Sequence, residues 1–189
     1  MRKAFTLIEM VFAVLIVGAL ASLAIGQFML TRTDSAVAAF RNDASVATKS
    51  IVGKVFADNL ITTTDKAPKP DDITKTPEIS WSEWILEVGG LDKSRWVKPV
   101  ASSPNADRGV SPAHTKNGVL LPCGSGAMIE ILENGDLYFN PSAVAKDTSA
   151  NSKEPEVCKK LRLSYESKTD LDNNGNKIFP LTTSQSLAY

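Results

Sequence analysis

The feature that most constrains this chain is a run of 22 uncharged residues, 10–31, that directly follows the acid Glu9. Two cations, Arg2 and Lys3, precede the acid, and Arg32 ends the run. About 20 consecutive apolar residues form a helix that can cross the core of a bilayer. A carboxylate at the head of such a helix costs a few kcal/mol to bury, so it is usually retained for a partner or a function. The run therefore predicts a transmembrane helix in which Glu9 needs a partner.

The same run also has features of a secretory signal peptide. Arg2 and Lys3 would form its basic end, and the Ala-Leu-Ala triplet at 19–21 has the small-x-small form of a cleavage site. The apolar residues continue beyond this triplet to Leu30, however, and an acid inside the apolar region is unusual for such a peptide. These two features favour a helix that stays on the chain.

The residues around Glu9 carry a more specific signal. Residues 3–10 have the sequence KAFTLIEM, which resembles the processing motif of type IV pilin-like proteins and type II secretion pseudopilins. The resemblance is close over residues 1–30 and extends to the rest only in general layout. It implies that prepilin peptidase removes a leader, residues 1–4, by cutting between Ala4 and Phe5, and that the new amino group of Phe5 is methylated. The family usually has glycine where this chain has Ala4.

The resemblance also implies a role for Glu9 in assembly, and the charges give that role a physical reason. Cleavage before Phe5 creates an ammonium group, and Glu9 lies one helical turn further along the chain. In a filament of axially staggered helices, the Phe5 ammonium of one subunit would reach Glu9 of its neighbour, and this pair of buried charges would set the register of assembly. The alternative is that Glu9 extends to the headgroups near the helix end.

An amphipathic stretch continues the helix beyond the apolar run. Apolar residues recur there at spacings of three and four; they are Val37, Phe40, Ala44, Ala47, Ile51 and Val55. We expect one helix over 5–57, with a transmembrane segment at 5–31 and an amphipathic segment at 32–60. Gly18 and Gly26 mark either a place where the helix bends or a small-residue face that packs closely on other helices.

The composition changes after the amphipathic segment. Residues 62–77 contain three prolines and no apolar periodicity, which indicates a loop. Ser80 and Glu83 have the spacing of a capping box, and the pair Gly89-Gly90 can stop a helix, so a short helix is expected over 81–88. Three tryptophans follow the loop, namely Trp81, Trp84 and Trp96. Tryptophans in a small head are most often core residues, and a platform for a stacked ligand is the alternative.

The C-terminal half is predicted to form a small antiparallel sheet. Residues 98–117 indicate a loop, which places the chain's one histidine, His114, at the surface. The pair Asn134-Gly135 is favoured by type I′ hairpins and predicts a tight turn. Strands are expected on either side of that turn and at two other places; the four ranges are 118–121, 127–132, 137–140 and 157–165.

The two cysteines, Cys123 and Cys158, are expected to form a disulfide. If Arg2 and Lys3 mark the cytoplasmic end of a membrane helix, the head lies on the far side, where oxidising machinery can join thiols. Closing a loop of this size would add about 3 to 4 kcal/mol of stability in the chain-entropy model. The pairing also resembles the disulfide-bounded C-terminal region of many pilins. Two buried free thiols are the alternative.

One constellation near the C-terminus matches the start of a calcium loop. Asp170, Asp172 and Asn174 supply oxygen atoms at alternate positions, and Gly175 stands where such a loop needs its sharp turn. Leu181 occupies the position at which the loop would carry a bidentate glutamate. The alternatives are a calcium site and a solvated turn, and no other cofactor is expected.

The composition argues against two further classes of function. The 21 acids balance the 21 bases, so the chain lacks the basic excess of an electrostatic nucleic-acid binder. The sequence contains no phosphate-binding glycine loop and no recognisable Ser-His-Asp set, so we do not expect an enzyme.

Together these patterns predict an α+β fold of pilin-like architecture, in which a long N-terminal helix carries a head, 61–189, with a small antiparallel sheet. The resemblance implies a minor structural subunit of a type IV pilus or of a type II secretion or DNA-uptake pseudopilus. Its implied partners are prepilin peptidase, other pilin-like subunits, an inner-membrane assembly platform and membrane lipid. The implied location is the inner membrane, in a single pass with the head in the periplasm or at the cell surface, before entry into a filament. A monomeric, membrane-tethered binding module is the alternative function.

Overall fold

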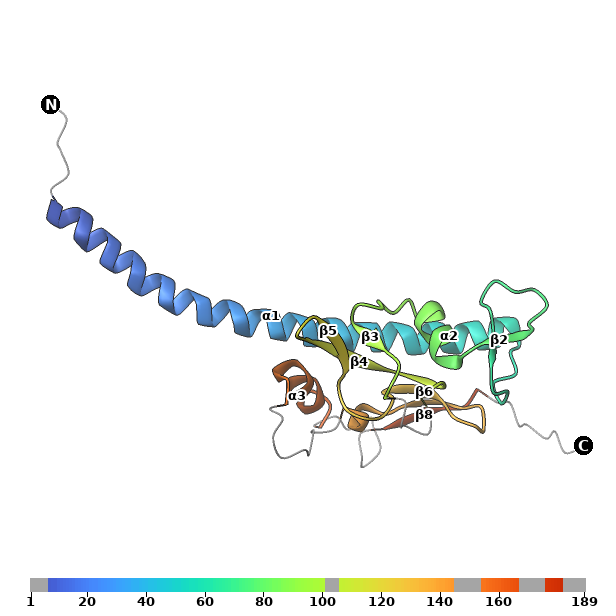
Figure 1. Cartoon of the computed structure of the whole chain (residues 1–189). Helices are drawn as coiled ribbons and strands as arrows, with labels where there is room; N and C mark the ends of the chain where they lie inside the picture. The colour runs from blue at the N-terminus through green and yellow to red at the C-terminus, as the bar shows by residue number, and fades with distance from the viewer. Residues whose placement is uncertain (1–6, 101–105, 145–153, 167–175, 182–189) are drawn as a thin grey trace, which may run out of the picture. The chain divides into compact units, whose positions relative to one another are not determined.

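The computed structural model describes residues 7–100, 106–144, 154–166 and 176–181, and for residues 22–31 it describes the backbone alone (Figure 1). The chain divides into two compact units, Met1–Ala36 and Val37–Tyr189. Helix α1, Leu7–Asp58, begins in the first unit and continues into the second.

The later part of α1 carries the amphipathic pattern predicted for it. All six apolar positions of that pattern are buried, and none is more than 9% exposed. The helix ends where Asn59 adopts a left-handed conformation with φ of 49°, which directs the Leu60 amide back to the carbonyl oxygen of Val55 at 3.0 Å. This pattern is typical of a Schellman C-cap, for which asparagine is the usual residue after glycine. The prediction of an amphipathic helix to residue 57 is confirmed over this stretch.

Helix α2, Trp81–Val88, forms where the capping signals predicted it. The Glu83 amide donates to the Ser80 side-chain oxygen at 3.3 Å, and Gly90, with φ of 63°, ends the helix. The tryptophans are at most 1% exposed, so their predicted role in packing is confirmed. Trp81 and Trp84 meet edge to face with ring centroids 5.4 Å apart.

Six strands form the larger sheet, and every pairing in it is antiparallel. The strand order is β3-β4-β6-β7-β8, with β5 paired to β4, and in Figure 1 these strands lie along one side of the later part of α1. Two further short strands, β1 and β2, pair with each other. The first lies inside the stretch predicted as a loop, and the second begins at the last residue of that stretch. The bounds are β1 Ala67–Pro68, β2 Pro77–Ile79, β3 Trp96–Val97, β4 Gly109–Lys116, β5 Val119–Pro122, β6 Ile129–Ile131, β7 Leu137–Phe139 and β8 Lys177–Phe179.

Two polar anchors hold the second unit together. Asp43 on α1 accepts a hydrogen bond from the Trp96 indole at 3.1 Å and pairs with Arg95 at 3.2 Å, which ties the helix to β3. Arg108 is buried and donates to the carbonyl oxygens of Ile131 and of three other residues, Thr62, Thr64 and Leu132. Since a buried charge needs such partners, Arg108 fixes the segment after α1 against the end of β6.

The predicted strand at 157–165 is wrong, because these residues form helix α3, Glu156–Leu163. Its two buried residues, Cys158 and Leu161, are three positions apart and so share one helical face. Glu156 lies in the first turn, and basic residues lie in the last, which suits the helix dipole. The 3₁₀ helix η1, Pro141–Ala143, precedes α3.

The predicted loop at 98–117 is also wrong in its second half, where β4 lies. Asn117 and Gly118 both have positive φ, 52° and 79°, and they join β4 to β5 with Lys116 paired to Val119. Both central residues of this two-residue turn are left-handed, as in the type I′ turns that an Asn-Gly pair favours. The prolines of the segment indicate a loop, whereas the pairing of β4 with its neighbours decides its conformation.

The predicted turn at Asn134-Gly135 is present, but it has a different form. Gly135 has φ of 90°, whereas Asn134 does not have a positive φ. The Leu132 amide donates to the carbonyl oxygen of Asp136 at 2.9 Å, which leaves a three-residue loop between β6 and β7. Three-residue hairpin loops commonly place one left-handed glycine at their end, and this one does so.

The predicted transmembrane segment at 5–31 is wrong. No helix in the described residues is both long enough and apolar enough to cross a membrane. A membrane-crossing helix needs about 20 consecutive apolar residues, and α1 carries the carboxylate of Glu9 in its first turn. This finding overturns the fold class that contained a transmembrane helix, and with it the predicted single-pass location in the inner membrane. The described fold has three α-helices, one 3₁₀ helix and antiparallel strands.

Candidate functional site

The first described part of α1 presents a continuous apolar surface, which we call the N-terminal apolar segment, residues 7–21. Every residue in it is exposed, and its ten large apolar side chains are between 48% and 84% exposed. Examples are Leu7, Phe12, Leu15 and Leu20. Single exposed apolar side chains are ordinary on protein surfaces, but a contiguous patch of this kind marks an interaction site.

The segment is apolar around its whole circumference. Consecutive helical residues point about 100° apart, so the run Val14, Leu15, Ile16, Val17 covers every side of the helix. A surface helix of a globular protein would have one apolar stripe and one polar face. A helix without a polar face is normally buried among other helices or in another apolar environment. The segment therefore needs a covering partner.

Glu9 lies in the first turn of α1 and is exposed. A carboxylate at this position interacts favourably with the positive end of the helix dipole. The two residues of the predicted processing site, Ala4 and Phe5, lie outside the described residues, as does the whole leader at 1–4. The assembly role of Glu9 stays a prediction.

The predicted disulfide between Cys123 and Cys158 is present, with the two Cα atoms 5.5 Å apart. Both residues are nearly inaccessible, at 2% and 3% exposed. The bond joins the segment after β5 to α3. It thereby closes a loop of 35 positions, which restricts the unfolded chain and stabilises the fold.

His114 lies beside this disulfide, which sequence spacing did not indicate. The residue is on β4 rather than in a surface loop, and its Nδ1 atom is 3.6 Å from Cys158 Sγ. Burial lowers the pKa of His114, and the positive charge of Lys116 lowers it further. The ligand atoms of His114 and both cysteines lie within 4.8 Å of one another. Because the two sulfurs are bonded to each other, they are not thiolates and cannot serve as metal ligands in this state.

The predicted calcium ligands are Asp170, Asp172 and Asn174, and all three lie outside the described residues. The calcium site therefore stays a prediction. The strand that follows them, β8, is described and pairs with β7.

The functional side chains described above belong to two separate places on the chain. The N-terminal apolar segment with Glu9 belongs to the first unit, while the disulfide and His114 belong to the second. The function of the chain must be inferred from these residues and their geometry. No protein-family model, no curated protein and no solved structure matches this chain.

Proposed function

We propose that this chain is a structural subunit of a filament of the type IV pilus or type II secretion pseudopilus class, and that it assembles through the N-terminal apolar segment. The observation that carries the proposal is the exposure of apolar side chains on all sides of α1 over residues 7–21. In a filament, copies of this helix would pack against one another and cover that surface. The KAFTLIEM motif gives the class of filament.

Packing of the N-terminal apolar segments makes a hydrophobic contribution to association. Burying a large apolar side chain that begins half exposed contributes about 1 to 2 kcal/mol, and the segment has ten of them. This gain comes from α1 itself and needs no contribution from the head.

Glu9 gives the assembly its register in this proposal. A carboxylate enclosed by apolar helices is stable only when a cation and hydrogen-bond donors meet it. After prepilin peptidase removes the leader, the amino group of Phe5 in a neighbouring copy supplies that cation. Removing one partner of a buried ion pair costs about 3 to 5 kcal/mol, so subunits shifted along the axis are disfavoured.

The first experiment determines the mature N-terminus. We expect mass spectrometry of the chain from its native cells to find Phe5 as the first residue, with an added methyl group on its amine. An intact Met1 would contradict the processing step, and a chain that begins at residue 22 would show ordinary signal cleavage instead.

The second experiment tests assembly by the content of filaments sheared from cells that produce the chain. We expect Glu9→Gln to be absent from the filament fraction and Leu15→Lys to be absent as well, while both accumulate in the cell with the disulfide formed. Glu87→Gln is the matched control, because Glu87 is an exposed acid on α2, outside the segment. Normal filament content for Glu9→Gln and Leu15→Lys would overturn the proposal.

A further inference from the structure

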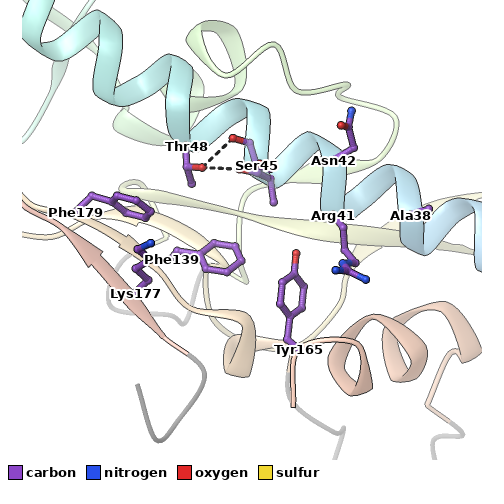
Figure 2. A pocket seen from close by; sticks show the side chains of 10 residues that line it. Ala38, Arg41, Asn42, Ser45, Thr48, Phe139, Tyr165, Lys177 and Phe179 are labelled. Atoms are coloured by element: carbon purple, nitrogen blue, oxygen red, sulfur yellow. Dashed lines mark hydrogen bonds between the residues drawn. The ribbon is translucent and has the colours of Figure 1, made fainter. Parts of the chain in front are cut away.

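A pocket of about 520 Å³ lies within the second unit, between α1 and the end of the larger sheet formed by β7 and β8 (Figure 2). Residues 38–48 of α1 line one side, and Phe139, Phe179, Lys177 and Tyr165 line the other. Sites for small molecules usually measure about 300 to 1,000 Å³ and combine apolar walls with a few placed polar groups. The pocket has the size of such a site.

The two walls of the pocket differ in chemistry. The sheet wall is aromatic: Phe139 is 9% exposed and meets Tyr165 edge to face, with ring centroids 5.5 Å apart. The helix wall carries the polar residues Arg41, Asn42, Ser45 and Thr48, and Figure 2 shows Arg41 directed from α1 toward Tyr165. The Thr48 hydroxyl donates within the helix, to the carbonyl oxygens of Ala44 and Ser45 at 2.9 and 3.1 Å. Its proton is therefore engaged within the helix, and Arg41 is the cationic donor of this wall.

The charges that line the pocket have one sign. Arg41 and Lys177 are cationic, and none of the described lining residues is acidic. Each cation lies over a ring: the Arg41 Cζ atom is 5.7 Å from the centroid of Tyr165, and Lys177 Nζ is 5.1 Å from that of Phe179. Burial raises the pKa of Tyr165 to about 12 in spite of the nearby Arg41 charge, so its phenol stays protonated at neutral pH.

We propose that this pocket binds a small organic anion, namely a carboxylate carried on an aromatic ring. The planar guanidinium of Arg41 matches a carboxylate with two parallel hydrogen bonds. The ammonium of Lys177 lies on the other side of Phe139 in Figure 2 and makes the potential of the pocket more positive. The ring of the ligand packs on the aromatic wall at Phe139 and Phe179. The site belongs wholly to the second unit, and it does not depend on assembly through the N-terminal apolar segment.

The test uses benzoate as the probe, with benzamide as its neutral analogue and acetate as the anion without a ring. Binding to the full-length chain is measured by ligand-observed saturation-transfer NMR, which is suitable whether the chain is monomeric or assembled. We expect benzoate to bind with a dissociation constant of about 1 mM, as suits a ligand of its size. Benzamide and acetate are expected to bind at least about tenfold more weakly, since each lacks one of the two matched features.

Variants locate the binding. Arg41→Gln is expected to weaken benzoate binding about tenfold, Lys177→Gln is expected to weaken it by a smaller factor, and Arg41→Lys is expected to retain part of it. Lys49→Gln is the control, because it removes one exposed cation from the same helix outside the pocket. Circular dichroism verifies that each variant is folded. Lys177 is exposed, so Lys177→Gln is expected to fold and still tests the proposal if Arg41→Gln does not fold.

Three outcomes would overturn the proposal. The first is the absence of saturable benzoate binding, and the second is equal binding of benzamide and benzoate. The third is a loss of binding in Lys49→Gln as large as that in Arg41→Gln, which would reveal only a general attraction of anions to the protein.

Discussion

His114 shows how a single residue acquires its chemistry from its neighbours. The imidazole lies against the Cys158 sulfur on one side and is partly shielded from water by β4 and α3. Since burial disfavours the charged form, the pKa of His114 falls below its ordinary value of 6.5. The protonated imidazole is thus less stable in the folded chain than in the unfolded one, and the fold is linked to pH through this residue.

The linkage predicts a loss of stability as the pH falls through 6.5. Above that pH His114 is neutral in both states, so it contributes no pH dependence. Below it the unfolded chain binds a proton that the folded chain accepts only at lower pH, and this favours unfolding. We expect urea unfolding at about pH 8 and about pH 5.5 to show a larger decrease in the free energy of unfolding for the natural chain than for His114→Gln.

The carboxylates of the chain also titrate, but they are common to both proteins, and the comparison removes their contribution. An identical decrease in the two proteins would show that His114 has the same pKa in the folded and the unfolded chain.

At the scale of elements, glycines define where strands approach one another and where they turn. A Cβ atom at Gly109, at the start of β4, would lie 2.4 Å from Ala127 Cβ and 2.8 Å from the carbonyl oxygen of Ile129. These distances are shorter than any normal contact, so a side chain at this position would force β4 away from β6. Gly53 on α1 differs, since a Cβ atom there would meet nothing within 4 Å.

Alanine substitutions at the two glycines are expected to change the free energy of unfolding in opposite directions. Gly109→Ala is expected to lower the free energy of unfolding by about 1 to 3 kcal/mol, because the strands must move apart. Gly53→Ala is expected to raise it by up to about 1 kcal/mol, because alanine favours the helix and has open space. Urea denaturation of the two variants measures both effects. An unchanged stability in Gly109→Ala would mean that β4 and β6 are not packed as closely as described.

At the scale of the whole molecule, the hydrophobic core belongs to the second unit. The buried cluster begins at Val37 on α1 and extends to Leu181 after β8, and none of its described members precedes Val37. The polar anchors at Asp43 and Arg108 are also within this unit. The packing that stabilises the second unit therefore does not depend on the N-terminal apolar segment.

This division predicts that a chain of residues 33–189 folds without the segment. We expect its free energy of unfolding to equal that of the full chain within about 0.5 kcal/mol, as for surface changes that touch no core contact. Analytical ultracentrifugation is expected to show a monomer for the shortened chain and association for the full chain. Equal association of both chains would place the self-association surface in the head, contrary to the proposed function.

The sequence by itself determined the features that depend on residues close together in the chain. The amphipathic face of α1, the capped helix α2 and a turn at Asn134-Gly135 follow from local periodicity and turn chemistry. The disulfide was predicted through the oxidising compartment expected for the head and through the resemblance to pilins. The apolar character of residues 7–21 and the position of Glu9 were also evident, whereas the inference of a membrane-crossing helix from them was wrong.

Only the tertiary structure decided that residues 156–163 form a helix, that β4 occupies a proline-containing segment, and that His114 meets the disulfide. The pocket also depends on the fold, because its two cations, Arg41 and Lys177, are far apart in sequence. Such features arise when distant segments bury surface against each other, and that packing energy exceeds the small local preferences of each segment. A single sequence records the local preferences, and the pairing of distant segments appears only once the chain is folded.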